Sequence, residues 1–484
     1  MLDANTFRLA WGRSLDDSSK RSLTLVLNLL AVAPLVVVGL LLVGFHQESL
    51  RPWFTVLAYA AIGLTLFLQV NVSKDWLNPL ILILGASVVR YTLPALYSRP
   101  EEVESIGVYR FLALTPGSWE AGHDLALLGI LSTILGWVVL EGSYGESKVV
   151  KPQSRSALPL KAGMAVGLLS LVIFVELNGS FLTAVYTGYF RSLTVDRGGA
   201  FFYLGLILIP SAVILVSVDG VTLRLLRIAP SVLAASWYFI LGGRARAATP
   251  LLAAVLTLRC LGANSAKRSI MKGVALAVTI GFISLLIAFS GSVYRATDRG
   301  DGWSYSIRSF QDYLSTSLIA DIGNLHSLAA ATTRPPGDLQ GATFIGNLLW
   351  PLSKALGLPS QSAGVFLVRD LNESDRPSGL HASLIGDAYI NFGARGVAIV
   401  CFLFGAAVKV IYLLWRKRLI HPAIYALSLV YALRIFLETI EKWPETLVVL
   451  GFGTGLLYIG RELWKPDDEF TRALSLDSSA TTPI

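Results

Sequence analysis

Apolar runs of about twenty residues recur along almost the whole chain, and this recurrence limits the possible fold more than any other feature. A bilayer core about 30 Å thick is crossed by roughly twenty helical residues, because a helix satisfies its backbone hydrogen bonds internally. A pair of such runs lies between Ala229 and Leu261, and with it the sequence predicts about twelve transmembrane helices. The other runs are Ser22–Phe45, Trp53–Val70, Leu77–Tyr97, Trp119–Leu140, Leu158–Leu177, Ala200–Val218, Met271–Val293, Ser383–Trp415, His421–Thr439 and Thr446–Ile459.

The composition excludes an ordinary soluble domain. Hydrophobic residues make up 54% of the chain and charged residues 15%, with a mean hydropathy of +0.62. Cys260 and Cys401 fall at or inside predicted spans, so we expect neither a disulfide framework nor a thiol metal site. A polar tail precedes a first run too long for a signal peptide, so we expect no cleavage there. Topology accounts for the net charge of +8, and we expect no nucleic-acid partner.

Basic residues predict the orientation. Twelve spans place both termini on one side, and 22 of the 40 Lys and Arg residues fall in the tail and loops of that side. The positive-inside rule makes that side cytoplasmic. The other 18 lie outside or within spans, and all but Lys354 and Lys442 are arginine. Arginine binds phosphate in bidentate fashion, so the outer face suggests an anion site, with a lipid diphosphate as the leading candidate. Pairing with loop carboxylates or lipid headgroups is the alternative.

The predicted layout has four parts. Residues 1–293 form the first spans, 294–382 a large outer loop, 383–460 the last three spans and 461–484 a cytoplasmic tail. Within the large loop, apolar residues recur every three to four positions from Ile307 to Leu328, and a second apolar stretch runs from Phe344 to Leu356. Both predict amphipathic helices lying on the outer surface.

The pair of runs between Ala229 and Leu261 is broken by two glycines that precede Arg244 and Arg246. Residues 247–258 make a helix about 18 Å long, too short to cross a bilayer. Either Arg259 snorkels and the helix continues, or the tip lies below the outer surface with both arginines facing a cavity. A tight turn whose arginines reach headgroups is the alternative.

The tenth span opens with an unusual density of polar residues. On a continuous helix Asp387, Asn391 and Arg395 share one face, at i, i+4 and i+8. Such a stripe must face protein or water. It predicts either a wet substrate cavity or a hydrogen-bonded stripe that fixes helix packing.

Residues 384–396, Leu-Ile-Gly-Asp-Ala-Tyr-Ile-Asn-Phe-Gly-Ala-Arg-Gly, resemble the late-span signature of Wzy-type O-antigen polymerases. Gly242-Gly243-Arg244 is similar to the Gly-Ser-Arg-Gly turn of that family, from which Gly243 and Ala245 depart. The number of spans and the position of the large loop are similar too. His381 resembles the histidine of the related O-antigen ligases, although Ala382 replaces the expected Asn and the spacing differs by one residue.

The resemblance implies an all-α, GT-C-like fold in the bacterial inner membrane, with the active site facing the periplasm. It implies transfer of a glycan from undecaprenyl diphosphate to the terminal sugar of another lipid-linked unit, without cofactor or metal. Expected partners are the lipid-linked donor and acceptor, membrane lipids and a chain-length regulator of the Wzz type.

Roles for individual residues follow from this chemistry. The leaving diphosphate needs positive charge, for which Arg244 and Arg246 are the first candidates. The attacking hydroxyl needs a base; an imidazole exchanges its proton near neutral pH, which favours His381, and Asp387 is the rival. Further candidates for binding substrate are Arg191, Arg197, Arg90, Arg376, Tyr389, Asn391 and Arg395.

Three other functions fit a chain of this kind. An O-antigen ligase would pass the glycan to a lipid A core and would favour His381 as base. A lipid-linked oligosaccharide flippase or transporter also has about twelve spans, but the halves show no repeat and the outer loop is large. A polyprenyl-monophosphate-sugar glycosyltransferase usually has acidic residues in its first outer loop, where this chain offers only Glu48.

Overall fold

The computed structural model of the protein describes residues 17–45, 48–73, 77–97, 114–140, 157–178, 199–218, 226–240, 244–261, 325–349, 382–440 and 442–462. Within these ranges the chain forms helices joined by turns and contains no strand. The predicted all-α class is confirmed.

The helical elements alternate between long rods and short pieces. In chain order they are α2 (Asp17–Phe45), η1 (Glu48–Leu50), α3 (Arg51–Ser73), α4 (Pro79–Ser87), η2 (Val88–Thr92), α5 (Leu93–Tyr97), α7 (Pro116–Val139), α8 (Leu158–Asn178), α10 (Gly199–Gly205), α11 (Leu208–Leu215), η4 (Leu226–Ile228), α12 (Ala229–Ile240), α13 (Arg244–Leu261), α17 (Leu325–Thr332), α18 (Ala342–Leu348), α20 (Ser383–Arg416), α21 (Pro422–Leu437) and α22 (Lys442–Glu462). The element η2 is a π-helix that continues α4 into α5.

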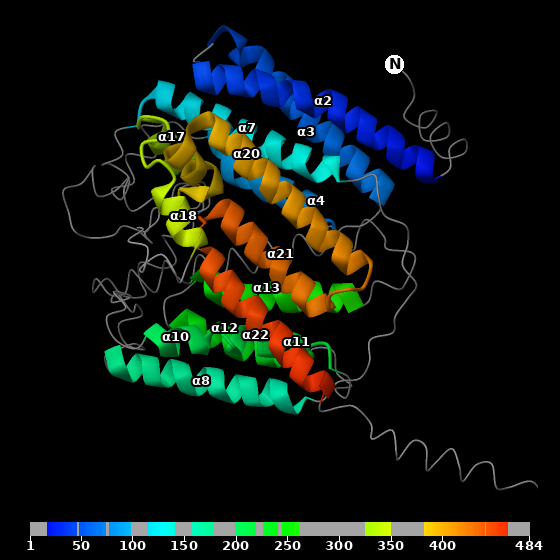
Figure 1. The fold of residues 1–484 in the computed structure, drawn as a ribbon, viewed down its shortest axis with the longest axis vertical. Helices are drawn as coiled ribbons and strands as arrows, with labels where there is room; N and C mark the ends of the chain where they lie inside the picture. Colours follow the sequence, from blue (N-terminus) through cyan, green and yellow to red (C-terminus); the bar gives the residue numbers. More distant parts are fainter. Residues whose placement is uncertain are drawn as a thin grey trace, which may run out of the picture.

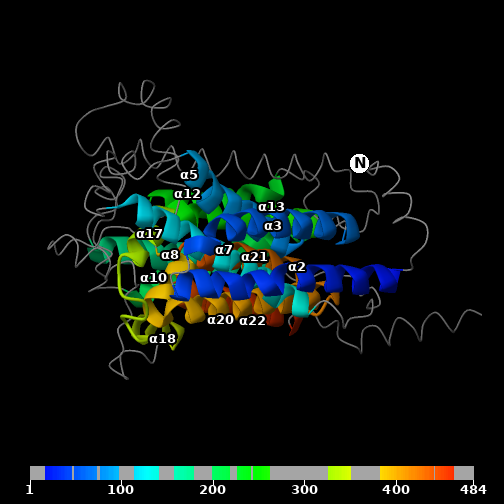
Figure 2. The same ribbon diagram turned by 90° about the horizontal axis from the view of Figure 1, so that it is seen from above.

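The helices lie side by side with their axes in roughly one direction (Figure 1). They extend from α2 and α3 at one edge to α8 at the other, with α7, α20, α21 and α13 between them. Seen from above, the short helices α17 and α18 sit at one end of this bundle (Figure 2). That end, where α20 also begins, is termed the loop end.

Within the described ranges, five helices are long and apolar enough to cross a membrane: Thr24–Phe45, Arg51–Val70, Pro116–Val139, Leu158–Leu177 and Ser383–Arg416. Shorter apolar helices cover Pro79–Ala95, Gly199–Leu215 and Pro422–Leu437. The predicted span Ala200–Val218 is divided by a turn between α10 and α11, and Met271–Val293 lies outside the described residues. The architecture is that of an all-helical membrane protein, and the count of twelve spans stays a prediction.

Large apolar side chains point away from the bundle on several long helices. Leu30 on α2, Val56 on α3, Leu169 on α8 and Ile399 on α20 are each at least 60% exposed. Regular exposure of this kind on hydrophobic helices indicates a surface that contacts lipid.

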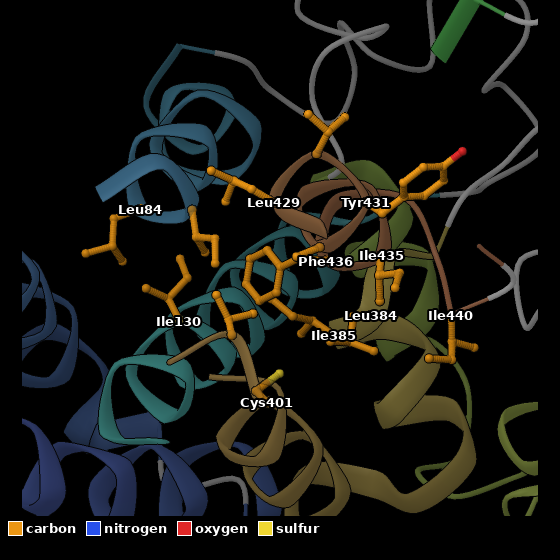
Figure 3. Packing of buried hydrophobic residues seen from close by; sticks show 14 of the residues in the cluster. Leu84, Ile130, Leu384, Ile385, Cys401, Leu429, Tyr431, Ile435, Phe436 and Ile440 are labelled. Atoms are coloured by element: carbon orange, nitrogen blue, oxygen red, sulfur yellow. The ribbon is translucent and has the colours of Figure 1, made fainter. Parts of the chain in front are cut away.

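Helix α7 lies at the centre of one half of the bundle and is buried along most of its length. Glycines bring it into backbone contact with its neighbours: a Cβ at Gly136 would collide with the Phe402 carbonyl of α20, and one at Gly405 with the Thr133 carbonyl of α7. In membranes such small residues allow close van der Waals packing, which drives helix association. Around this contact α4, α7, α20 and α21 share one apolar core, which includes Leu84, Ile130, Cys401 and Phe436 (Figure 3).

The large loop folds differently from the prediction. Residues 325–331 of α17 are all buried, and the helix packs against α7 and α20 instead of lying on a surface. A Cβ at Gly122 of α7 would lie 2.6 Å from the Ala329 nitrogen, so a run of alanines opposite a glycine permits this close approach. The expectation of a surface helix is therefore wrong for α17. Apart from residues 325–349 and Ala382, the predicted large loop lies outside the described residues.

We predict that Gly136→Ala destabilises the protein by about 1–3 kcal/mol, because its Cβ meets the α20 backbone. Thermal unfolding of the purified protein in detergent measures this. The matched control is Gly63→Ala on α3, where a Cβ meets nothing within 4 Å and helix propensity improves. Equal unfolding temperatures for the two variants would contradict the prediction.

Candidate functional site

Helix α20 is interrupted at Gly393, whose backbone leaves the helical region (φ 69°, ψ −166°). Any larger residue would be strained there by the positive φ, and its Cβ would lie 3.3 Å from that of Pro336. The break removes the usual donors to the carbonyls of the preceding turn. The connection between α17 and α18 replaces them: Gly337 N donates to Tyr389 O (3.2 Å), Leu339 N to Ile390 O (3.2 Å) and Gly341 N to Asn391 O (3.0 Å).

The side chain of Asn391 strengthens the same connection. Its Nδ2 donates to Thr343 Oγ1 of α18 (2.8 Å) and to the Asp387 carbonyl (2.8 Å), and its Oδ1 accepts from Phe344 N (3.4 Å). Asn391 is buried, as is Tyr389 two residues before it. These contacts assign Asn391 to holding α18 against the first half of α20.

The predicted stripe through Arg395 is wrong. Asp387 and Asn391 are buried, whereas Arg395 is exposed. The reason is the break at Gly393, which changes the helical phase between Asn391 and Arg395. The i, i+4, i+8 rule holds only along an uninterrupted helix.

Asp387 is held by the connection between α21 and α22. Its Oδ2 accepts hydrogen bonds from Thr439 Oγ1 (2.6 Å) and from Ile440 N (3.0 Å). The same connection also binds the start of α20, where the backbone nitrogen of Ser383 donates a hydrogen bond to the Glu438 carbonyl (2.7 Å). Asp387 thus lies at the loop end, fixed to the segment that enters α22.

A group of five charged residues meets beside this connection: Arg246 of α13, Arg434 and Glu438 at the end of α21, and Lys442 and Glu445 at the start of α22. It is termed the arginine cluster. Glu445 lies at its centre. The Oε2 atom of Glu445 is 2.9 Å from both Nε and Nη2 of Arg246, and its Oε1 is 2.8 Å from Nη1 of Arg434.

The second carboxylate of the arginine cluster is that of Glu438, at the end of α21. Glu438 Oε1 is 3.4 Å from Arg434 Nε, and Glu438 Oε2 is 3.9 Å from Lys442 Nζ. Among the described residues the cluster brings together three cationic side chains and two carboxylates, and each cation is paired with a carboxylate. Ionisable side chains gathered inside a membrane protein are a candidate functional site.

Aromatic rings support both arginines. The Arg246 guanidinium lies 4.9 Å from the ring centre of Phe202, and that of Arg434 lies 5.2 Å from the ring of Tyr431. Tyr431 also donates from its hydroxyl to Glu445 Oε1 (3.1 Å). Cation–π contact of this kind is worth about 2 kcal/mol when desolvated, and it holds the guanidinium planes in fixed positions.

The other predicted site residues are distributed unevenly. Arg244 begins α13, but its side chain lies outside the described residues, as do Arg191, Arg197, Arg376 and His381. Arg90 lies in η2, away from the arginine cluster in sequence, and acts electrostatically on His326 of α17. The structure therefore brings Arg246 into the same region of the loop end as Asp387, through the connection between α21 and α22.

A second polar group occupies the loop end between α3 and α7. Arg51 donates from Nη1 to Glu120 Oε2 (2.6 Å) and from Nε to Asp124 Oδ2 (2.7 Å), while the Tyr59 hydroxyl lies 2.6 Å from His123 Nε2. None of these residues belongs to a site predicted from the sequence. Asp124 and His123 fall inside a predicted span, and ionisable residues at such positions need partners, which was the available signal.

The centre of the arginine cluster was missed for a related reason. Arg434 lies inside the predicted span His421–Thr439, so it needed a carboxylate partner, and Glu445 is one of the nearest in sequence. Its pairing with Arg246, 199 residues away, had no local signal.

No three His, Cys, Asp or Glu side chains in the described ranges lie close enough together to hold a metal ion. The guanidinium groups of Arg246 and Arg434 are instead suited to an anion.

No family model, curated protein or solved structure matches the chain. The resemblance to O-antigen polymerases therefore rests on the motifs alone, and the geometry of the loop end provides the rest of the functional argument.

We predict that Arg434→Met lowers stability by about 3 kcal/mol or more, because it leaves the buried Glu445 with one arginine fewer and removes the ion pair between Arg434 and Glu438. Thermal unfolding in detergent measures this. Arg395→Met is the control, since the exposed Arg395 should change stability by no more than about 0.5 kcal/mol. Equal effects would show that the cluster contributes nothing to folding.

We also predict that acid destabilises the protein through His326. Burial, assisted by the Arg90 guanidinium, lowers the pKa of His326 from 6.5 to about 3. The unfolded chain therefore binds this proton at a higher pH than the folded one, so the stability is fully present above pH 6.5 and declines as the pH falls toward 3. Unfolding temperatures between about pH 7.5 and pH 5 should fall less steeply for His326→Asn than for the unmodified protein. Identical slopes would contradict this assignment.

Proposed function

We propose that this protein is a membrane-embedded glycosyltransferase that polymerises lipid-linked oligosaccharide repeat units. The donor glycan leaves undecaprenyl diphosphate and joins the terminal sugar of a second lipid-linked unit at the periplasmic side of a bacterial inner membrane. One observation carries the proposal. At the loop end the carboxylate of Glu445 gathers the guanidinium groups of Arg246 and Arg434, and the connection beside them holds a second buried carboxylate, Asp387.

The arginine cluster suits the leaving group. When the bond between the sugar and the diphosphate breaks, the diphosphate keeps the electron pair and gains a negative charge. Arg246 and Arg434 are fixed by ion pairs and rings, so their charges are already oriented before the reaction. Arg244 begins the same helix as Arg246 and is the natural third donor.

Asp387 is the candidate base within the described residues. It would accept the proton of the attacking sugar hydroxyl as the new glycosidic bond forms. Thr439 and Ile440 N hold one of its oxygens and thereby fix the orientation of the carboxylate. His381, six residues earlier in the chain, stays the rival for this role.

The break in α20 supports the same interpretation. Irregular backbone at membrane depth is tolerated where protein buries it or where it lines a cavity. Here residues 337–341 of the large loop supply the missing hydrogen bonds. This segment is thus anchored to the end of the half-helix that contains Asp387.

The test is a reconstituted assay. The purified protein receives the host's native lipid-linked repeat unit in the presence of EDTA and without nucleotide sugar, and the products are separated on a gel. A ladder of lengthened glycans is the expected result. Transfer only after addition of lipid A core would make the protein a ligase. Transfer to no acceptor would refute the transferase proposal and direct attention to flipping.

We predict that Arg246→Gln reduces ladder formation about a hundredfold at equal amounts of folded protein, because the variant lacks one positive charge that would stabilise the departing diphosphate. The control is Arg416→Gln, an exposed residue at the opposite end of α20, which should retain full activity. Asp387→Asn should abolish transfer if Asp387 is the base, and activity close to that of the unmodified protein would transfer the role to His381.

A further inference from the structure

Glu445 occupies the position at which the arginine cluster would hold an anion. Both of its oxygens are used: Oε2 pairs with Nε and Nη2 of Arg246, and Oε1 pairs with Nη1 of Arg434 and the hydroxyl of Tyr431. Four donor atoms from two other helices therefore converge on one carboxylate. Two guanidinium groups around two oxygens is also the arrangement that binds a phosphate group.

We infer that Glu445 is a resident counter-ion, which holds Arg246 and Arg434 in place and is displaced by the diphosphate of the lipid-linked donor. This inference rests on the proposed function, because a diphosphate is the anion that the reaction would bring to the loop end. Glu445 is then a positioning residue and a competitor of the substrate.

The charges favour such an exchange. Glu445 supplies one negative charge to two arginines, whereas a diphosphate linked to a lipid and a sugar supplies two. When Glu445 withdraws, Arg434 keeps Glu438 as a partner. Arg246 keeps none among the described residues, so its charge is the one that the incoming diphosphate neutralises.

The position of Glu445 in its helix permits the movement. It lies in the first turn of α22, directly after Pro444 and close to the connection that begins at Glu438. Arg246 and Arg434 lie on α13 and α21 and are fixed by the rings of Phe202 and Tyr431. The exchange would therefore require the Glu445 side chain to rotate away while the rings of Phe202 and Tyr431 keep their contacts with the guanidinium groups.

The test measures binding, not catalysis. The full-length protein in lipid nanodiscs at low ionic strength is titrated with farnesyl diphosphate, which has the diphosphate and a prenyl chain but no glycan. We expect Glu445→Gln to bind this probe about tenfold more tightly than the unmodified protein, since a competing charge is removed. Damage to the fold would weaken binding, so a gain in affinity separates competition from a purely structural role.

A matched control and a milder variant complete the experiment. Glu120→Gln removes the carboxylate of an ion pair with Arg51, outside the arginine cluster, and should leave the affinity within about twofold. Tyr431→Phe keeps the ring beneath Arg434 but removes the hydrogen bond to Glu445, and should tighten binding about threefold even if Glu445→Gln fails to fold.

The outcomes separate the two proposals. If the unmodified protein binds the probe and neither variant binds it more tightly, the counter-ion role is refuted and the proposed transferase function is untouched. If neither the unmodified protein nor the variants bind the probe, the proposed diphosphate site is refuted, and the counter-ion role of Glu445 is refuted with it.

Discussion

The contact of one carboxylate with two arginines fixes the architecture of the loop end. Glu445 joins α22 to α13 through Arg246 and to α21 through Arg434, and none of these charges could be buried alone. The pairing therefore determines how the ends of three helices meet. Because Glu438 and Thr439 continue directly from α21, the same contact sets the place of the connection that holds Asp387. The arginine cluster and the carboxylate of Asp387 thus lie at the same end of the bundle.

The break at Gly393 divides α20 into two parts with different packing. Its second half is a long apolar helix that packs closely on α7 through Gly405. Its first half ends at a positive φ and is completed by backbone donors from the large loop. The residues that resemble a polymerase signature are therefore divided in function: Asn391 and Gly393 build the joint, whereas Asp387 faces the connection between α21 and α22.

The described part of the predicted large loop, residues 325–349, packs into the helix bundle. Helix α17 lies in the core against Gly122, and α18 is tied to Asn391. Any movement of the loop between these helices would disturb the carbonyls at the end of the first half of α20. Helix α18, the segment before it and the first half of α20 are therefore joined by hydrogen bonds into one structural unit.

The sequence by itself determined the helical class, the apolar segments, the interruption before Arg244 and the start of α20 near Ser383, because each depends on hydropathy or glycine content over a few neighbouring residues. Only the tertiary structure decided that Arg395 is exposed, that α17 is buried and that Glu445 pairs with Arg246 from 199 residues away. A helical phase predicts a shared face only while the helix is continuous, and Gly393 ends that continuity. A charged residue inside a predicted span indicates that it has an ion-pair partner, but the packing of distant helices determines which residue that partner is.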